Sequence, residues 1–274
     1  MSDAPLAPPS PDLALALPEA APALDAKSAL AWAHTARFLT TAAELKHLPQ
    51  SELPEVAFVG RSNAGKSTAI NTLAQTRRLA FASKTPGRTQ HINLFALGPR
   101  DAPDAHWADL PGYGYAAVPK SAKVRWQRVM AHYLDVRRNL AGVVMMVDSR
   151  LGFTEIDRNL LDYVAPRVRT GQVKLLVLLT KADKLTRAEG ARALQAAHVV
   201  LGEIATDESD LGMTLFSALN KTGLEDVALT LRQWVLDAPR IAMPDVVPDA
   251  PSGEQPEIET GTDSSSDSDS AGVE

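Results

Sequence analysis

The hydrophobic positions of this sequence fall into short runs separated by longer amphipathic segments. Two runs are continuously apolar, Val143 to Val147 and Leu175 to Leu179. Such runs of Val, Leu and Met are typical of strands buried on both faces, as in a parallel sheet covered by helices on each side. A further segment, His91 to Leu97, alternates like a half-buried strand.

The same pattern predicts the order of elements along the chain. We predict strands at residues 56–60, 91–97, around 107, 142–147, 173–179 and 213–216. We predict helices at residues 66–77, 121–138, 155–164, 187–204 and 224–234, and a short helix at 29–39. Strands that alternate with helices favour an α/β fold, here a mainly parallel six-stranded sheet with helices on both faces.

The two ends of the chain differ from this pattern. Residues 1–36 are rich in Ala and Pro, and we interpret them as a flexible arm because proline interrupts helices. Residues 241–274 contain nine acidic residues, many Ser and no Lys or Arg, which predicts a disordered tail. The folded domain is therefore expected at residues 37–240, where basic residues outnumber acidic ones by about seven. A basic domain suits a polyanionic partner or simply a soluble surface.

Composition removes several classes of protein. The chain has no Cys, which excludes disulfides, thiol catalysis and Cys-type zinc sites. No apolar run approaches the roughly 18 residues of a membrane helix, and no secretory leader pattern is evident at the start. We therefore expect a cytoplasmic protein.

A phosphate-binding pattern lies between the first predicted strand and the following helix. It fits G-x-x-x-x-G-K-[ST] and reads Gly60-Arg61-Ser62-Asn63-Ala64-Gly65-Lys66-Ser67. The glycines let backbone N–H groups point at a phosphate, and the helix N-terminus adds partial positive charge. Lys66 would reach the outer phosphates, and the Ser67 hydroxyl would bind Mg²⁺.

Three other strand ends carry matching chemistry. Asp109-Leu110-Pro111-Gly112 would hold Mg²⁺ through water and present the Gly112 N–H to a γ-phosphate. Thr180-Lys181-Ala182-Asp183 would place a carboxylate on the N1–H and exocyclic amine of guanine, with the Lys181 stem over the base. Phe216-Ser217-Ala218 would supply backbone N–H groups to the guanine oxygen. Each phrase alone also fits an ordinary turn, but their order after successive strands predicts guanine-nucleotide binding.

With these motifs the chain resembles the EngB family (also called YihA or YsxC), within the TrmE-Era-EngA-EngB-septin-like GTPases. The resemblance covers about residues 37–240. Besides the phosphate loop and the guanine phrase, it rests on Phe38 to Leu45, on Lys84-Thr85-Pro86-Gly87-Arg88-Thr89-Gln90 and on Asp109-Leu110-Pro111-Gly112-Tyr113-Gly114-Tyr115-Ala116.

The resemblance implies a Ras-like GTPase domain that helps to assemble the large (50S) ribosomal subunit and supports normal cell division. It implies GTP and GDP as ligands, a monomer, and Mg²⁺ held by Ser67, Thr89 and, through water, Asp109. Lys66, Thr89 and Gly112 would be catalytic, and the effector loop would be Gly87-Arg88-Thr89-Gln90-His91.

Particular residues refine this expectation. Tyr113 stands where Ras-like enzymes place a water-orienting Gln, which predicts slow intrinsic hydrolysis. Thr180 replaces the usual Asn, which predicts a weaker tie between the base loop and the phosphate loop. Asn63 matches phosphate loops of K⁺-stimulated relatives, so we hypothesise K⁺ stimulation, with a loop-bracing amide as the alternative. Tyr133, like Trp126, is expected to pack in or beside the core.

The remaining alternatives concern the partner. The helix predicted at residues 121–138, which follows the loop from Asp109 to Gly112, is basic. Its face either binds rRNA or is only solvated. It bears Lys123, Arg125, Arg128, Arg137 and Arg138. The leading hypothesis is a ribosome-directed enzyme. The alternatives are a GTP-dependent switch acting on a non-ribosomal protein effector and the nucleotide-binding head of a membrane transporter.

Overall fold

A computed structural model of the chain describes residues 24–80, 91–114 and 129–239. Its sheet has seven strands in the order β1-β3-β4-β2-β5-β6-β7. The strands are β1 (Arg37–Ala42), β2 (Glu55–Gly60), β3 (Ile92–Leu97), β4 (Ala105–Asp109), β5 (Leu140–Asp148), β6 (Lys174–Thr180) and β7 (Leu211–Leu215). Pairs from β4 through β2, β5 and β6 to β7 are parallel, whereas β3 is antiparallel to both β1 and β4.

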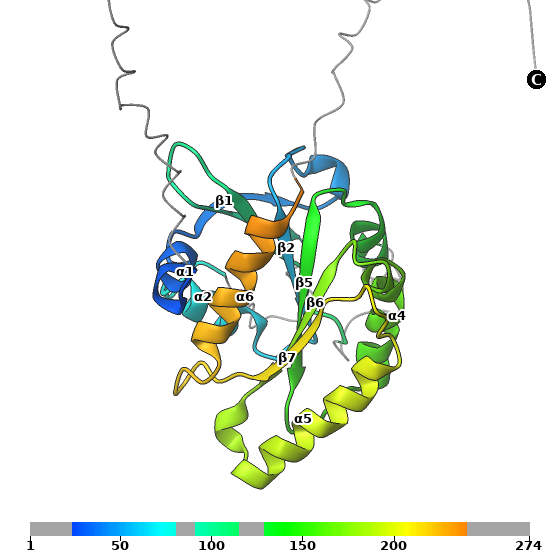
Figure 1. The fold of residues 1–274 in the computed structure, drawn as a ribbon. Coiled ribbons are helices and arrows are strands. Elements are labelled where there is room, and N and C mark those ends of the chain that lie inside the picture. Colours follow the sequence, from blue (N-terminus) through cyan, green and yellow to red (C-terminus); the bar gives the residue numbers. More distant parts are fainter. Residues whose placement is uncertain (1–23, 81–90, 115–128, 240–274) are drawn as a thin grey trace, which may run out of the picture. The chain divides into compact units, whose positions relative to one another are not determined.

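Helices cover both faces of this sheet (Figure 1). One face carries α1 (Ala26–Ala33), α2 (Lys66–Leu73) and α6 (Leu224–Asp237), and the other carries α4 (Glu155–Arg169) and α5 (Arg187–Gly202). Residues 129–136 are also helical, and single 3-10 turns lie at η1 (Leu45–His47) and η2 (Ala182–Lys184). The α/β fold with a mainly parallel sheet is confirmed. None of the described helices combines the length and apolar content needed to span a bilayer.

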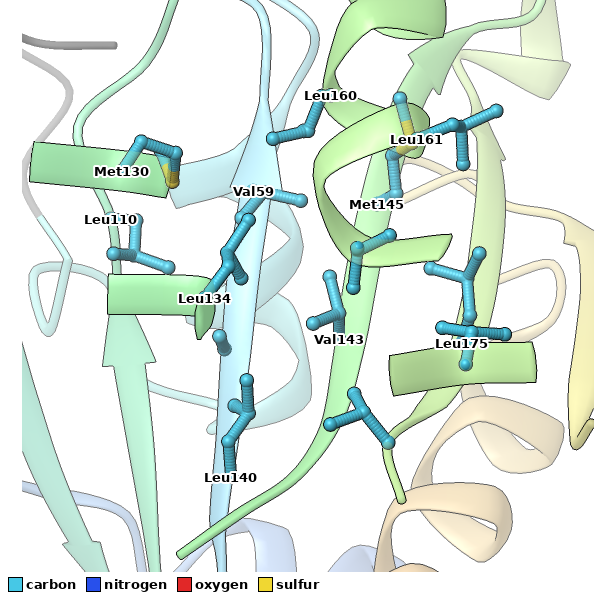
Figure 2. Close-up of a cluster of buried hydrophobic side chains, with 14 of the residues drawn as sticks. Val59, Leu110, Met130, Leu134, Leu140, Val143, Met145, Leu160, Leu161 and Leu175 are labelled. Carbon is cyan, nitrogen blue, oxygen red and sulfur yellow. The ribbon is translucent and has the colours of Figure 1, made fainter. Parts of the chain in front are cut away.

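The central strands supply side chains to two hydrophobic cores. Along β5, Val143 and Met145 belong to one core, and Val144 and Met146 belong to the other. Figure 2 shows the first of these cores, where residues of β2 and β5 face residues of α4. The buried apolar runs therefore correspond to strands covered on both sides, as the sequence pattern predicts.

The prediction of six strands was wrong because it omitted β1. This edge strand exposes 57% of Phe38 and 44% of Leu39, and its register shifts between Phe38 and Thr40. A half-exposed strand with an irregular register has no clean alternation of polar and apolar residues. Its existence depends on hydrogen bonds to β3, far along the chain.

The first helix also differs from its predicted range of 29–39. It begins after Asp25, whose carboxylate accepts a hydrogen bond from the Ser28 amide at 2.7 Å, and it ends at Ala33. Trp32 in this helix donates from Nε1 to Asp104 at 2.9 Å, and Arg232 of α6 lies 5.0 Å over the Trp32 ring. Thus α1 packs on α6 although it precedes residue 37. The domain boundaries themselves, including the flexible arm and acidic tail, stay predictions.

Candidate functional site

The phosphate loop connects the buried strand β2 to α2. Gly65 has a φ of +100°, a left-handed conformation that residues with a Cβ rarely adopt. Lys66 then begins α2, so the free N–H groups of its first turn face the loop. This strand, loop and helix N-terminus are what phosphate binding requires.

The second loop, residues 109–112, lies directly beside the phosphate loop. Asp109 ends β4 and is 3% exposed, and its carboxylate contacts the ammonium of Lys66. A Cβ built on Gly112 would lie 3.3 Å from the backbone N and Cα of Ser62. Gly112 therefore allows a close approach of the two loops that a larger residue would hinder.

The third loop, residues 180–183 (the base loop), presents the residues predicted to bind guanine. Asp183 follows β6, and its Oδ1 accepts a hydrogen bond from the Ser217 hydroxyl at 2.8 Å. That hydrogen bond, with a further contribution from Lys184, lowers the pKa of Asp183, so its carboxylate is ionised at neutral pH. The amide of Ala182 donates to the Phe216 carbonyl at 3.1 Å, which joins the third loop to the segment after β7. An ionised carboxylate is the acceptor that the two donors of guanine require.

Thr180 joins this base loop to the phosphate loop. Its hydroxyl donates to the Ala64 carbonyl at 2.6 Å, and its oxygen lies 3.2 Å from the Val147 carbonyl. The side chain is 2% exposed, so these contacts are shielded from water. Thr180 therefore does tie the two loops together through a direct hydrogen bond. That this tie is weaker than the one an Asn would make stays a prediction.

Sequence reasoning missed two charged residues beside this site, Asp148 and Arg150, which contact the predicted residue Lys181 or its partner. Lys181 donates to the Asn63 carbonyl at 2.7 Å and to Asp148 Oδ2 at 2.8 Å. Asp148 also accepts from Arg150, whose Nε and Nη2 lie 2.9 and 2.7 Å from its two oxygens. The Arg150 hydrogen bonds, with Lys181, hold the pKa of Asp148 well below its usual range despite burial. A signal existed, since Asp148 ends the parallel strand β5 next to β6.

Several predicted site residues lie outside the described part of the chain. These are Gly87, Arg88, Thr89 and Gln90. Their neighbour His91 is described and exposed. Roles for this effector loop stay predictions.

Comparisons with known proteins agree with this geometry. A family model described as 50S ribosome-binding GTPase matches residues 55–181. A relative from Polaromonas sp., named as a probable GTP-binding protein EngB, is 60% identical over 77% of this chain and 82% of its own length. A relative of the same name from Acidovorax ebreus is 61% identical over 75% of this chain and 90% of its own. The chain belongs to the EngB family. It is a GTP-binding protein and a GTPase.

Solved structures show the same fold. A crystal structure of a probable EngB GTP-binding protein matches with a TM-score of 0.52 and 19% identity, over 66% of this chain and 98% of its own. A structure of Era in complex with MgGDPNP and part of 16S ribosomal RNA matches with a TM-score of 0.51 and 20% identity, over 71% and 59%. At these identities the likeness establishes the fold of the EngB-family chain.

The donor set of the site fits Mg²⁺. The Ser67 hydroxyl and the Asp109 carboxylate offer hard oxygen donors of the kind that Mg²⁺ prefers. Among the residues that the structure describes, no group of three or more His, Asp or Glu side chains could hold a metal ion by itself. Mg²⁺ at nucleotide sites is held by one or two protein oxygens together with phosphates, and such a site needs no larger cluster.

Tyr113 is anchored in the protein interior of this GTPase. It is 2% exposed, and its hydroxyl donates to Asp157 Oδ1 of α4 at 2.8 Å. Burial, followed by the nearby Asp157 charge, raises the pKa of Tyr113 well above its usual value, so the hydroxyl keeps its proton. The Tyr113 carbonyl also accepts from the Ser62 amide at 2.7 Å. Tyr113 thus fixes the second loop against the phosphate loop and α4.

The helix predicted at residues 121–138 ends at residue 136 in the structure, so Arg137 and Arg138 follow the helix and do not lie on it. Arg137 pairs through two hydrogen bonds of 2.9 Å with Glu55, which is fully buried. Tyr133 donates to the same carboxylate and is itself buried, as predicted for a core residue. Arg137 is therefore part of an internal ion pair, whereas Arg138 is exposed. Lys123, Arg125, Trp126 and Arg128 lie outside the described residues.

Thr180→Val tests the tie between the loops. It keeps the shape of the side chain but leaves the Ala64 carbonyl without its buried donor. GDP affinity should fall roughly tenfold, or about 1.4 kcal/mol, in a fluorescent-GDP titration. Thr180→Ser, which retains the hydroxyl, is the control and should stay close to wild type. Equal affinities for the Val and Ser variants would contradict the role.

Tyr113→Phe separates anchoring from chemistry. Loss of the hydrogen bond to Asp157 should lower the free energy of unfolding by about 1.5–3 kcal/mol in urea denaturation. The kcat of GTP hydrolysis should stay at the wild-type value, because the hydroxyl is bound to α4. A large fall in kcat with unaltered stability would instead place this hydroxyl in the reaction.

Proposed function

We propose that this GTPase is an assembly factor for the large (50S) ribosomal subunit, which it binds in one nucleotide state and leaves in another. On this proposal it acts in the cytoplasm as a monomer and supports normal cell division and growth. The observation that carries the proposal is the match of residues 55–181 to the family described as 50S ribosome-binding GTPase. The positive excess of residues 37–240 suits rRNA phosphates and adds support.

In this proposal the loops at the carboxyl edge of the sheet share the work. The phosphate loop and Lys66 hold the phosphates, and Asp183 and Lys181 hold the guanine. Mg²⁺ would be held by Ser67 and Thr89 and, through water, by Asp109, and would neutralise developing charge on the phosphates. The Gly112 amide would face the γ-phosphate. The anchored Tyr113 orients no water, so intrinsic turnover is slow and a partner accelerates it.

Co-sedimentation with purified large subunits tests the ribosomal assignment. Binding should be strongest with a non-hydrolysable GTP analogue and weaker with GDP or without nucleotide. Lys66→Ala should abolish this nucleotide dependence, because it removes the ammonium on the phosphates. Lys174→Ala, at the far end of β6, is the matched control and should behave as wild type. Absence of binding in every state, to mature and precursor subunits, would favour a non-ribosomal protein effector.

We also propose K⁺ stimulation of hydrolysis, based on Asn63 in the phosphate loop. Asn63 has a φ of +67°, a left-handed conformation that Asn tolerates better than most residues, and its carbonyl is held by Lys181. Turnover should be faster in K⁺ than in Na⁺ buffer at equal ionic strength. Equal rates would remove the proposal and leave Asn63 as a residue that shapes the loop.

A further inference from the structure

A buried carboxylate outside the nucleotide motifs contacts the ammonium of Lys181. Asp148 ends β5, is 8% exposed, and lies opposite Thr180 in the parallel register of β5 and β6. Lys181 is the next residue after that partner. The strand pairing itself therefore brings this carboxylate to the base loop.

Every acceptor position of the Asp148 carboxylate is used. Oδ1 accepts from the Arg150 amide at 3.1 Å and from Arg150 Nε at 2.9 Å. Oδ2 accepts from Arg150 Nη2 at 2.7 Å and from Lys181 Nζ at 2.8 Å. A carboxylate offers about four such positions, so Asp148 has a single orientation in this network.

The Lys181 side chain is held at its tip by two fixed acceptors. Its ammonium donates to Asp148 and to the Asn63 carbonyl, and its backbone has the left-handed φ of +60°. Lysine has several rotatable bonds, and a free lysine would lose conformational freedom when a base packs against it. Here that freedom is already lost within the protein, which favours binding of a flat ligand.

We propose that Asp148 is a positioning residue for nucleotide binding, which, braced by Arg150, fixes the Lys181 stem as a platform for the purine ring. This inference rests on the proposed guanine site formed by Lys181 and Asp183. The platform contacts the face of the base, whereas Asp183 recognises its edge. Asp148 therefore sets affinity for purine nucleotides in general, and Asp183 sets the preference for guanine.

The test compares GDP with IDP, which lacks the exocyclic amine. Asp148→Asn removes the charge that holds the Lys181 ammonium, and it should weaken GDP and IDP affinity by about tenfold each. The ratio of the two affinities should stay at the wild-type value, because Asp183 is still held by Ser217. The KM for GTP should rise, and kcat at saturating GTP should hold. Unchanged affinity would overturn the inference, and so would a collapsed ratio, which indicates a general loss of loop structure.

Two further variants keep the test decisive. Lys181→Met retains an apolar stem but has no ammonium, and it should reproduce the loss for both nucleotides even if Asp148→Asn folds poorly. In the Lys181→Met background, Asp148→Asn should change GDP affinity little, because the two residues act through one contact. Full additivity of the two losses would contradict the role.

Asp237→Asn is the matched control. Asp237 pairs with Lys174 at 3.1 Å at the opposite end of β6, and its removal should leave both affinities at wild-type values. A wild-type protein that binds neither GDP nor IDP would refute the proposed nucleotide site. Wild-type binding with an unaffected Asp148→Asn variant would refute this inference alone.

Discussion

The parallel pairing of β4, β2, β5 and β6 is the constraint on which the site depends. Parallel strands end at the same edge of a sheet, so the loops after them meet without being long. The register places Phe58 beside Asp109, Gly60 beside Met146, and Asp148 beside Thr180. The two cores hold this register, because a slip by one residue would turn each buried strand face over. The loops predicted to bind the nucleotide are therefore positioned by the packing of residues far from them.

Hydrogen bonds between the loops complete what the strands begin. The Thr180 hydroxyl reaches the Ala64 carbonyl, the Ser62 amide reaches the Tyr113 carbonyl, and Lys66 contacts Asp109. Each contact joins two strand ends, so the loops brace one another. Such bracing keeps binding groups near their working positions before a ligand arrives. In this EngB-family GTPase the tyrosine after Gly112 belongs to that bracing.

Several basic residues of the domain pair with its own carboxylates. Arg137 is bound to the buried Glu55, and Arg150 and Lys181 share Asp148. These residues count as basic in the sequence, but each already pairs with a carboxylate of the same domain. A surface for a polyanion is therefore to be sought among exposed basic residues such as Arg138.

Local patterns determined the main elements and the motifs, because a phosphate loop or a buried strand is specified by residues within about a dozen positions of one another. The runs in β5 and β6 and the Gly60 to Ser67 loop are of this kind. Contacts between distant residues were decided by the tertiary structure alone. The edge strand β1 needs β3, α1 needs Asp104 and Arg232, Thr180 needs Ala64, and Arg137 needs Glu55. Periodicity describes which face of an element is buried, but it carries no information about which partner across the fold accepts a hydrogen bond or neutralises a charge.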